Sequence, residues 1–190
     1  KTLNECIKSE VARRENIVLY GQNIDAGSCL SGLTRSLQVR ASSRVINTPN
    51  SENTLVGVGF GLLLKGISSV FFVKQLDFIL LGMDQIINTN NFIRMTETNS
   101  SFTIMPIVVD SGYQGIQSSF NALGDVCSIA QVPGFTINNH LDAGIVINEE
   151  LFRPGFRIIG VSQRLFSEEC AQIPQIKKVA YDNSLFKYAN

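Results

Sequence analysis

The chain has 190 residues, and its 16 lysines and arginines balance 16 aspartates and glutamates, so the formal net charge is zero. This length suits one domain, and a hydrophobic fraction of 44% excludes a disordered chain. A neutral chain has no general attraction for nucleic acid or an anionic membrane, so neither is expected as a partner. Apolar runs such as Val56–Leu64 are too short to cross a bilayer, and no signal peptide opens the sequence, so we expect a cytoplasmic protein.

The cysteines and the histidine do not suggest a metal site. Cys6, Cys29, Cys127 and Cys170 are widely spaced and show no metal-ligand pattern. We expect them to be reduced and mostly buried. His140 is the only histidine and precedes a predicted helix, where a solvent-facing or capping role is more common than catalysis.

Helical and strand-like patterns alternate along the chain. Thr2 and Glu5 have the spacing of a capping box, which predicts a helix over Leu3–Val11. Ile17–Tyr20 is a continuous apolar run, typical of a strand buried on both faces. Further strands are expected at Arg44–Ile46, Val70–Val73, Ile104–Val109, Phe135–Ile137 and Arg157–Val161, and further helices at Leu30–Val39, Glu52–Lys65, Leu76–Met95 and Leu141–Leu151.

This alternation predicts an α/β fold of three layers, with a mainly parallel sheet and helices on both faces. Ligands of such sheets bind beyond the carboxyl ends of the strands. The loops that follow Tyr20, Ile46, Val73 and Val109 are therefore the expected site. We expect the domain to span residues 1–166 and a tail to span residues 167–190, docked on the domain or on a partner.

Gly57, Gly59 and Gly61 admit two interpretations. A dinucleotide-binding fingerprint needs the spacing GxGxxG directly after a strand, whereas these glycines have the spacing GxGxG and follow an acidic turn. Close packing of a helix against its neighbour is the favoured interpretation, and a nucleotide-binding domain is the least favoured functional hypothesis. The sequence contains no Walker motif and no G-x-S-x-G nucleophile elbow.

Glu52 stands at a strand-to-helix junction, ahead of an almost uncharged helix. Taken alone, it would be a first-turn glutamate that complements the helix dipole. Phe78, taken alone, would be one core aromatic of the next helix. The order of the neighbouring motifs gives both residues another interpretation.

Five segments resemble, in this order, the pyrimidine-binding domain of transketolase-like thiamine diphosphate enzymes. They are Ile17–Gln22, Arg44–Gly61, Gly66–Val70, Asp77–Asn88 and Pro133–Ile145. The family patterns RVIDTPISE and DF...A.DQI.N, for example, are similar to RVINTPNSE and DFILLGMDQIIN here. The branch that the chain most resembles is the beta subunit of 2-oxo acid dehydrogenases such as pyruvate dehydrogenase, over residues 3–166.

The resemblance implies thiamine diphosphate as the cofactor. In this family a glutamate hydrogen-bonds the aminopyrimidine ring in a general acid–base role, and Glu52 matches its position. Phe78 matches the aromatic residue that stacks on the ring. The implied reaction is decarboxylation of a 2-oxo acid, or conversion of a ketose, with acyl or two-carbon transfer.

Two positions depart from the family pattern. Gln22 stands where the beta subunits carry a carboxylate after the first strand, and Ser118 stands where they carry a histidine that handles protons on the substrate side. Both residues are still expected to line the cofactor site. Their identities support an alternative hypothesis, namely a catalytically inactive structural or regulatory subunit with the same fold.

The resemblance also implies a partner. The sequence lacks the GDG…N motif that holds magnesium and diphosphate in this family, and it ends where the beta subunit begins its C-terminal domain. We therefore expect no metal ligand in this chain and an alpha-type subunit that holds the diphosphate and magnesium. Activity would require both chains in a homo- or hetero-oligomer. Leu76–Met95, apolar around most of its circumference, is expected at the subunit contact.

Overall fold

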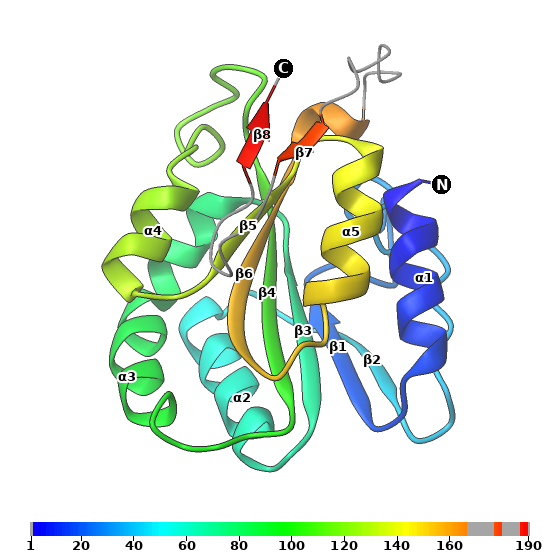
Figure 1. Ribbon diagram of the computed structural model, residues 1–190, viewed down its shortest axis with the longest axis vertical. Helices are drawn as coiled ribbons and strands as arrows, with labels where there is room; N and C mark the ends of the chain where they lie inside the picture. The colour runs from blue at the N-terminus through cyan, green and yellow to red at the C-terminus, as the bar shows by residue number, and fades with distance from the viewer. Residues whose placement is uncertain (1, 167–176, 180–186, 190) are drawn as a thin grey trace.

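The computed structural model describes residues 2–166, 177–179 and 187–189 (Figure 1). Its main body is a six-stranded sheet in which all five strand pairs are parallel. Helices cover both faces of this sheet (Figure 1). The predicted three-layer α/β fold is therefore confirmed.

The strands of the sheet are β1 (Ile17–Gly21), β2 (Arg44–Asn47), β3 (Ser68–Val73), β4 (Ser101–Val108), β5 (Gly134–Ile137) and β6 (Gly155–Ser162), in the order β2-β1-β3-β4-β6-β5. Helices α1 (Leu3–Arg13) and α5 (His140–Glu150) cover one face, and α2 (Glu52–Leu64), α3 (Asn90–Ile93) and α4 (Leu123–Ala130) cover the other (Figure 1). The short helices η1 (Leu76–Gly82) and η2 (Gln85–Thr89) precede α3, and η3 (Gln163–Phe166) follows β6. β7 (Lys177–Val179) and β8 (Lys187–Ala189) form a separate antiparallel pair, and the rest of the predicted tail lies outside the described residues.

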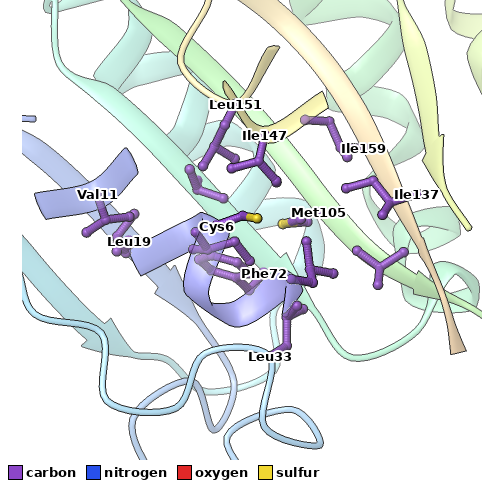
Figure 2. Packing of buried hydrophobic residues seen from close by; sticks show 14 of the residues in the cluster. Cys6, Val11, Leu19, Leu33, Phe72, Met105, Ile137, Ile147, Leu151 and Ile159 are labelled. Atoms are coloured by element: carbon purple, nitrogen blue, oxygen red, sulfur yellow. The ribbon is translucent and has the colours of Figure 1, made fainter. Parts of the chain in front are cut away.

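Two apolar clusters, one on each face of the sheet, form the core. The cluster beneath α1 and α5 includes Cys6, Phe72 and Met105 (Figure 2). On the other face, the ring of Phe60 lies 5.1 Å from that of Phe102 and 4.8 Å from that of Phe156, measured between centroids. Aromatic pairs at this distance stabilise a core beyond the area that they bury.

The start of α1 confirms the predicted capping box. The Thr2 side chain accepts a hydrogen bond from the Glu5 backbone N–H at 3.3 Å, and the Thr2 N–H donates to the Glu5 carboxylate at 2.9 Å. These two bonds satisfy donors that a helix end would otherwise leave free.

The continuous helix predicted over Leu76–Met95 is wrong, because the segment forms η1, η2 and α3 in succession. Gly82, at the end of η1, lies directly against α2. A Cβ at this position would lie 2.7 Å from the Val56 side chain, so the backbone comes very close to α2. The side chains of Phe92 and Met95 are exposed, and the prediction of a subunit contact there stays a prediction.

Two further helix predictions differ from the structure. The helix expected over Leu30–Val39 is wrong, since Cys29, Leu30 and Ser31 have positive φ angles and the segment forms turns. Conversely, α4 was not predicted. It has only 8 residues and begins after Ala122, whose side chain cannot cap it, so it lacks a start signal.

The cysteines, membrane spans and metal-binding clusters can be assessed only in the part of the chain that the structure describes. Cys6, Cys29 and Cys127 are free thiols there, and burial raises the pKa of Cys127 to about 11. Cys170 lies outside the described residues. Among the residues that the structure covers, no helix has the length and apolarity of a membrane span, and no cluster of metal-binding side chains occurs.

Of the three glycines in the cluster, Gly59 confirms the interpretation as close packing. A Cβ at Gly59 would overlap the Phe102 ring, so this residue lets α2 approach β4. A Cβ at Gly61 would meet no other atom within 4 Å. All three glycines lie inside α2 rather than ahead of it, so their backbone does not form a phosphate-binding loop at the helix N-terminus.

We predict opposite effects for Ala at these two glycines. Gly59→Ala should lower the free energy of unfolding by about 1–3 kcal/mol, because the added methyl group overpacks the core. Gly61→Ala should raise it by about 0.4–1 kcal/mol, because alanine restricts the unfolded chain at an open helix position. Urea unfolding of both variants measures the difference. Equal effects of the two substitutions would contradict the packing of α2 described here.

Candidate functional site

The order of the strands reverses between β1 and β3. From β1 the chain crosses to β2 on one side, and it then returns to form β3 on the other side of β1. In parallel α/β sheets, ligands bind outside the carboxyl ends of the strands at such a switch point. All four predicted site residues lie in segments that leave this edge: Gln22 after β1, Glu52 after β2, Phe78 after β3 and Ser118 after β4.

Gln22 and Thr48 are the first residues after the paired strands β1 and β2. Gly21 pairs with Asn47, and the Thr48 N–H donates a hydrogen bond to the Gly21 carbonyl at 3.0 Å. Gly21 has a φ of +151°, and a Cβ there would overlap the Phe72 carbonyl, so only glycine fits. Gln22 itself is half-buried. The Thr48 hydroxyl is buried and has no hydrogen-bond partner among the described residues.

Tyr20 holds the first turn of α2 over the sheet. Its hydroxyl donates to the Leu55 carbonyl at 2.9 Å, and its ring stacks on Phe71 with a centroid distance of 5.1 Å and an interplanar angle of 3°. Burial raises the pKa of Tyr20 far above its usual value, so the hydroxyl remains a donor. The start of α2 is therefore fixed relative to β1 and β3.

Glu52 is the first residue of α2, as predicted. Its side chain is half-buried, and its carboxylate has no hydrogen bond or ion pair with another described residue. A Cβ at Gly82 would lie 3.4 Å from the Glu52 carbonyl oxygen, so η1 packs against the first turn of α2. Phe78, also in η1, is half-buried against the core of this face. The structure thus brings the elements of Glu52 and Phe78 into contact, without an interaction between the two side chains among those described.

Ser118 is tied to the segment that follows β3. Its hydroxyl donates to the Gln75 side-chain oxygen at 2.8 Å. The Asp77 carboxylate accepts hydrogen bonds from the N–H groups of Ser119 at 3.3 Å and Phe120 at 3.2 Å. The loop after β4 is therefore held against the start of η1, and Ser118 comes close to the predicted site.

Three residues that shape this edge were not predicted to do so. Tyr20 was interpreted only as part of an apolar strand, and no sequence signal pointed to Gln75. Asp77 had a signal, because it precedes Phe78 in the DF motif. The loop partners of its carboxylate identify a positioning role.

The side chains at this edge are suited to a polar ring. The edge offers the free carboxylate of Glu52, the amide of Gln22, the hydroxyls of Thr48 and Ser118, and the ring of Phe78. Carboxylate and hydroxyl groups accept and donate hydrogen bonds at fixed positions, and an aromatic face adds stacking. A heteroaromatic ligand with ring nitrogens and an amino group matches this set.

No family model matches the chain, but curated relatives do. It is 30% identical over 141 residues to the beta subunit of the pyruvate dehydrogenase E1 component from Mesostigma viride, a match that covers 72% of this chain and 42% of the relative. It is 28% identical over 114 residues to the 2-oxoisovalerate dehydrogenase subunit beta of Bacillus subtilis, which covers 60% of this chain and 34% of the relative. It is also 28% identical over 96 residues to the acetoin:2,6-dichlorophenolindophenol oxidoreductase subunit beta of Cupriavidus necator. This match covers 45% of this chain and 28% of the relative.

These matches span less than half the length of each relative. The predicted resemblance is confirmed: this chain is similar to the beta subunits of pyruvate and other 2-oxo acid dehydrogenases.

Proposed function

We propose that this chain is the pyrimidine-binding part of a thiamine diphosphate-dependent enzyme that acts on a 2-oxo acid. The observation that carries this proposal is the half-buried carboxylate of Glu52, which has no described partner and lies at the switch point of the sheet. The names of the relatives, which include pyruvate and 2-oxoisovalerate dehydrogenase subunits, support the substrate class.

The residues at the edge fit the pyrimidine half of this cofactor. Glu52 and the buried Thr48 hydroxyl belong to one short segment, and neither has a hydrogen-bond partner among the described residues. Burying unpaired polar groups is unfavourable, so a ligand that satisfies them would be stabilised here. In this proposal Glu52 holds a proton at a pyrimidine nitrogen, and Phe78 supports the ring face. The cofactor, when bound, supplies the electron sink for decarboxylation.

Gln22 and Ser118 would position ligands rather than move protons. An amide does not titrate near neutral pH, and the Ser118 hydroxyl already donates to Gln75. The Ser118 oxygen can still accept a hydrogen bond from a ligand. These two side chains favour a second candidate function, a structural or regulatory subunit that keeps the fold without catalysis.

The proposed enzyme includes an alpha-type partner chain. This proposal assigns the magnesium and diphosphate to that partner, because the sequence lacks the GDG…N motif that holds them in the family it resembles. A cofactor shared in this way places the site at a contact between chains. The exposed apolar side chains of Leu81, Phe92 and Met95 are candidates for covered surface in the assembly.

We predict that Glu52→Gln, assembled with the partner chain, lowers turnover of a 2-oxo acid by about 10²–10⁴-fold, the usual range for a positioned acid–base group. The fold should persist, since loss of the helix-dipole contribution costs only about 0.3–1 kcal/mol. Asp125→Asn is the matched control, because it removes a first-turn carboxylate from α4 instead. Turnover with an artificial electron acceptor and thermal unfolding are measured together.

The outcomes separate the two candidate functions. Unchanged turnover in the Glu52→Gln complex would refute the role of Glu52. A native assembly that binds the cofactor and shows no turnover with any 2-oxo acid would establish the non-catalytic subunit instead.

We predict that Phe78→Ala weakens cofactor retention by about two- to tenfold, because an aromatic stack contributes about 0.5–1.5 kcal/mol. Phe92→Ala is the control, since Phe92 lies on the same segment but is 76% exposed. Dialysis of the cofactor-loaded assembly, followed by measurement of the cofactor that remains, gives the comparison. Equal losses from the two variants would contradict a stacking role for Phe78.

We expect the chain without its partner to bind thiamine diphosphate weakly or not at all, even with magnesium present. The phosphate contacts that contribute much of such affinity are charge-assisted hydrogen bonds, and this proposal assigns them to the partner. Titration calorimetry tests the chain alone and after addition of the alpha-type subunit. Submicromolar binding by a monomer would show that the site is not shared.

A further inference from the structure

A second site lies at the opposite edge of the sheet, where the strands begin. A cavity of about 200 Å³ opens there between α3, the end of α2, and the starts of β5 and β6. Leu63, Ile93, Val132 and Phe156 form its apolar wall, and each of them is buried. None of the residues assigned to the candidate cofactor site lines this cavity.

Asn90 is a buried polar residue that lines this cavity. The residue is 5% exposed, and its carboxamide has no hydrogen-bond partner among the described residues. Its polar atoms are not among the unpaired ones that are closed off from solvent, so the amide is accessible from the cavity. The only described bond of this residue to Arg94 uses its backbone carbonyl. Most buried amides in proteins are hydrogen-bonded, because an unpaired one is unfavourable. An unpaired amide at a cavity wall is placed to bond a molecule inside it.

Arg94, which is exposed to solvent, adds a positive charge to the lining of the cavity. It follows Asn90 by one helical turn, so the two side chains lie on the same face. One guanidinium N–H donates to the Gln131 side-chain oxygen at 3.0 Å, which holds the group at the cavity and leaves its other donors available. Among the described residues that line the cavity, Arg94 alone is charged.

We propose that this cavity binds a small monocarboxylate with a short aliphatic tail. Guanidinium groups bind carboxylates through paired, charge-assisted hydrogen bonds, and the Asn90 amide adds a donor beside them. The tail packs against the apolar wall. A water molecule takes about 30 Å³, so a cavity of about 200 Å³ holds six to seven such volumes. A molecule of the size of pentanoate fits within this volume.

The test uses sodium pentanoate as the probe and the full chain labelled with ¹⁵N for NMR titration. We expect saturable shifts of the amides of Asn90, Arg94 and Val132. Arg94→Met should weaken binding by about tenfold or more, and Asn90→Leu by about three- to tenfold, as for loss of a charged and a neutral hydrogen bond. Asn91→Leu is the matched control, because Asn91 is the exposed neighbour on the same helix and should leave the affinity unchanged.

Thermal unfolding separates a ligand-binding role of Asn90 from a structural one. Without pentanoate, Asn90→Leu should not lower the melting temperature, because it removes an unpaired polar group from an apolar wall. A lower melting temperature with unchanged pentanoate affinity would show a structural role and overturn the proposal.

Three other results would also overturn it. These are no binding at tens of millimolar, equal binding of uncharged pentan-1-ol with no effect of Arg94→Met, or shifts confined to the region of Glu52. The first means that the cavity holds only water, the second that it is a nonspecific apolar void, and the third that pentanoate occupies the other site.

Discussion

The candidate site depends on how α2 lies on the sheet. Two contacts one turn apart fix this helix: the Tyr20 hydroxyl bonds the Leu55 carbonyl, and Gly59 lies directly against the Phe102 ring. A larger residue at position 59 would lift the helix, and the Tyr20 bond would lengthen with it. Glu52 lies less than one turn before Leu55, so the same contacts determine where its carboxylate meets the edge of the sheet.

The other segments at this edge depend on α2 in turn. η1 can approach the first turn of α2 only because position 82 is glycine. Asp77, near the start of η1, then holds the loop after β4 through the N–H groups of Ser119 and Phe120. Each loop is thus positioned by a neighbour that is itself anchored, which suits a site whose groups must keep fixed distances from a ligand.

Most of the sheet could be predicted from the sequence, for a physical reason. Strands buried on both faces need continuous apolar runs, and Ile17–Tyr20 and Val70–Val73 are such runs. The division of Leu76–Met95 could not be predicted, because apolar residues look alike in α, 3-10 and π geometry. The order of motifs indicated Glu52 and Phe78, but the role of Asp77 depends on contacts 42 and 43 residues away, which local patterns do not encode.

Backbone and side-chain contacts both hold the loop after β4 at the candidate site. Asp77 holds this loop through the backbone N–H groups of Ser119 and Phe120, and the Ser118 hydroxyl adds a side-chain bond to Gln75. The two Asp77 bonds use backbone N–H groups, so they do not depend on which side chain stands at position 118. The Ser118 hydroxyl donates a hydrogen bond to Gln75, and its oxygen can still accept one from a ligand. A loop held in this way is compatible with both candidate functions, and the chemistry of Glu52 is what distinguishes them.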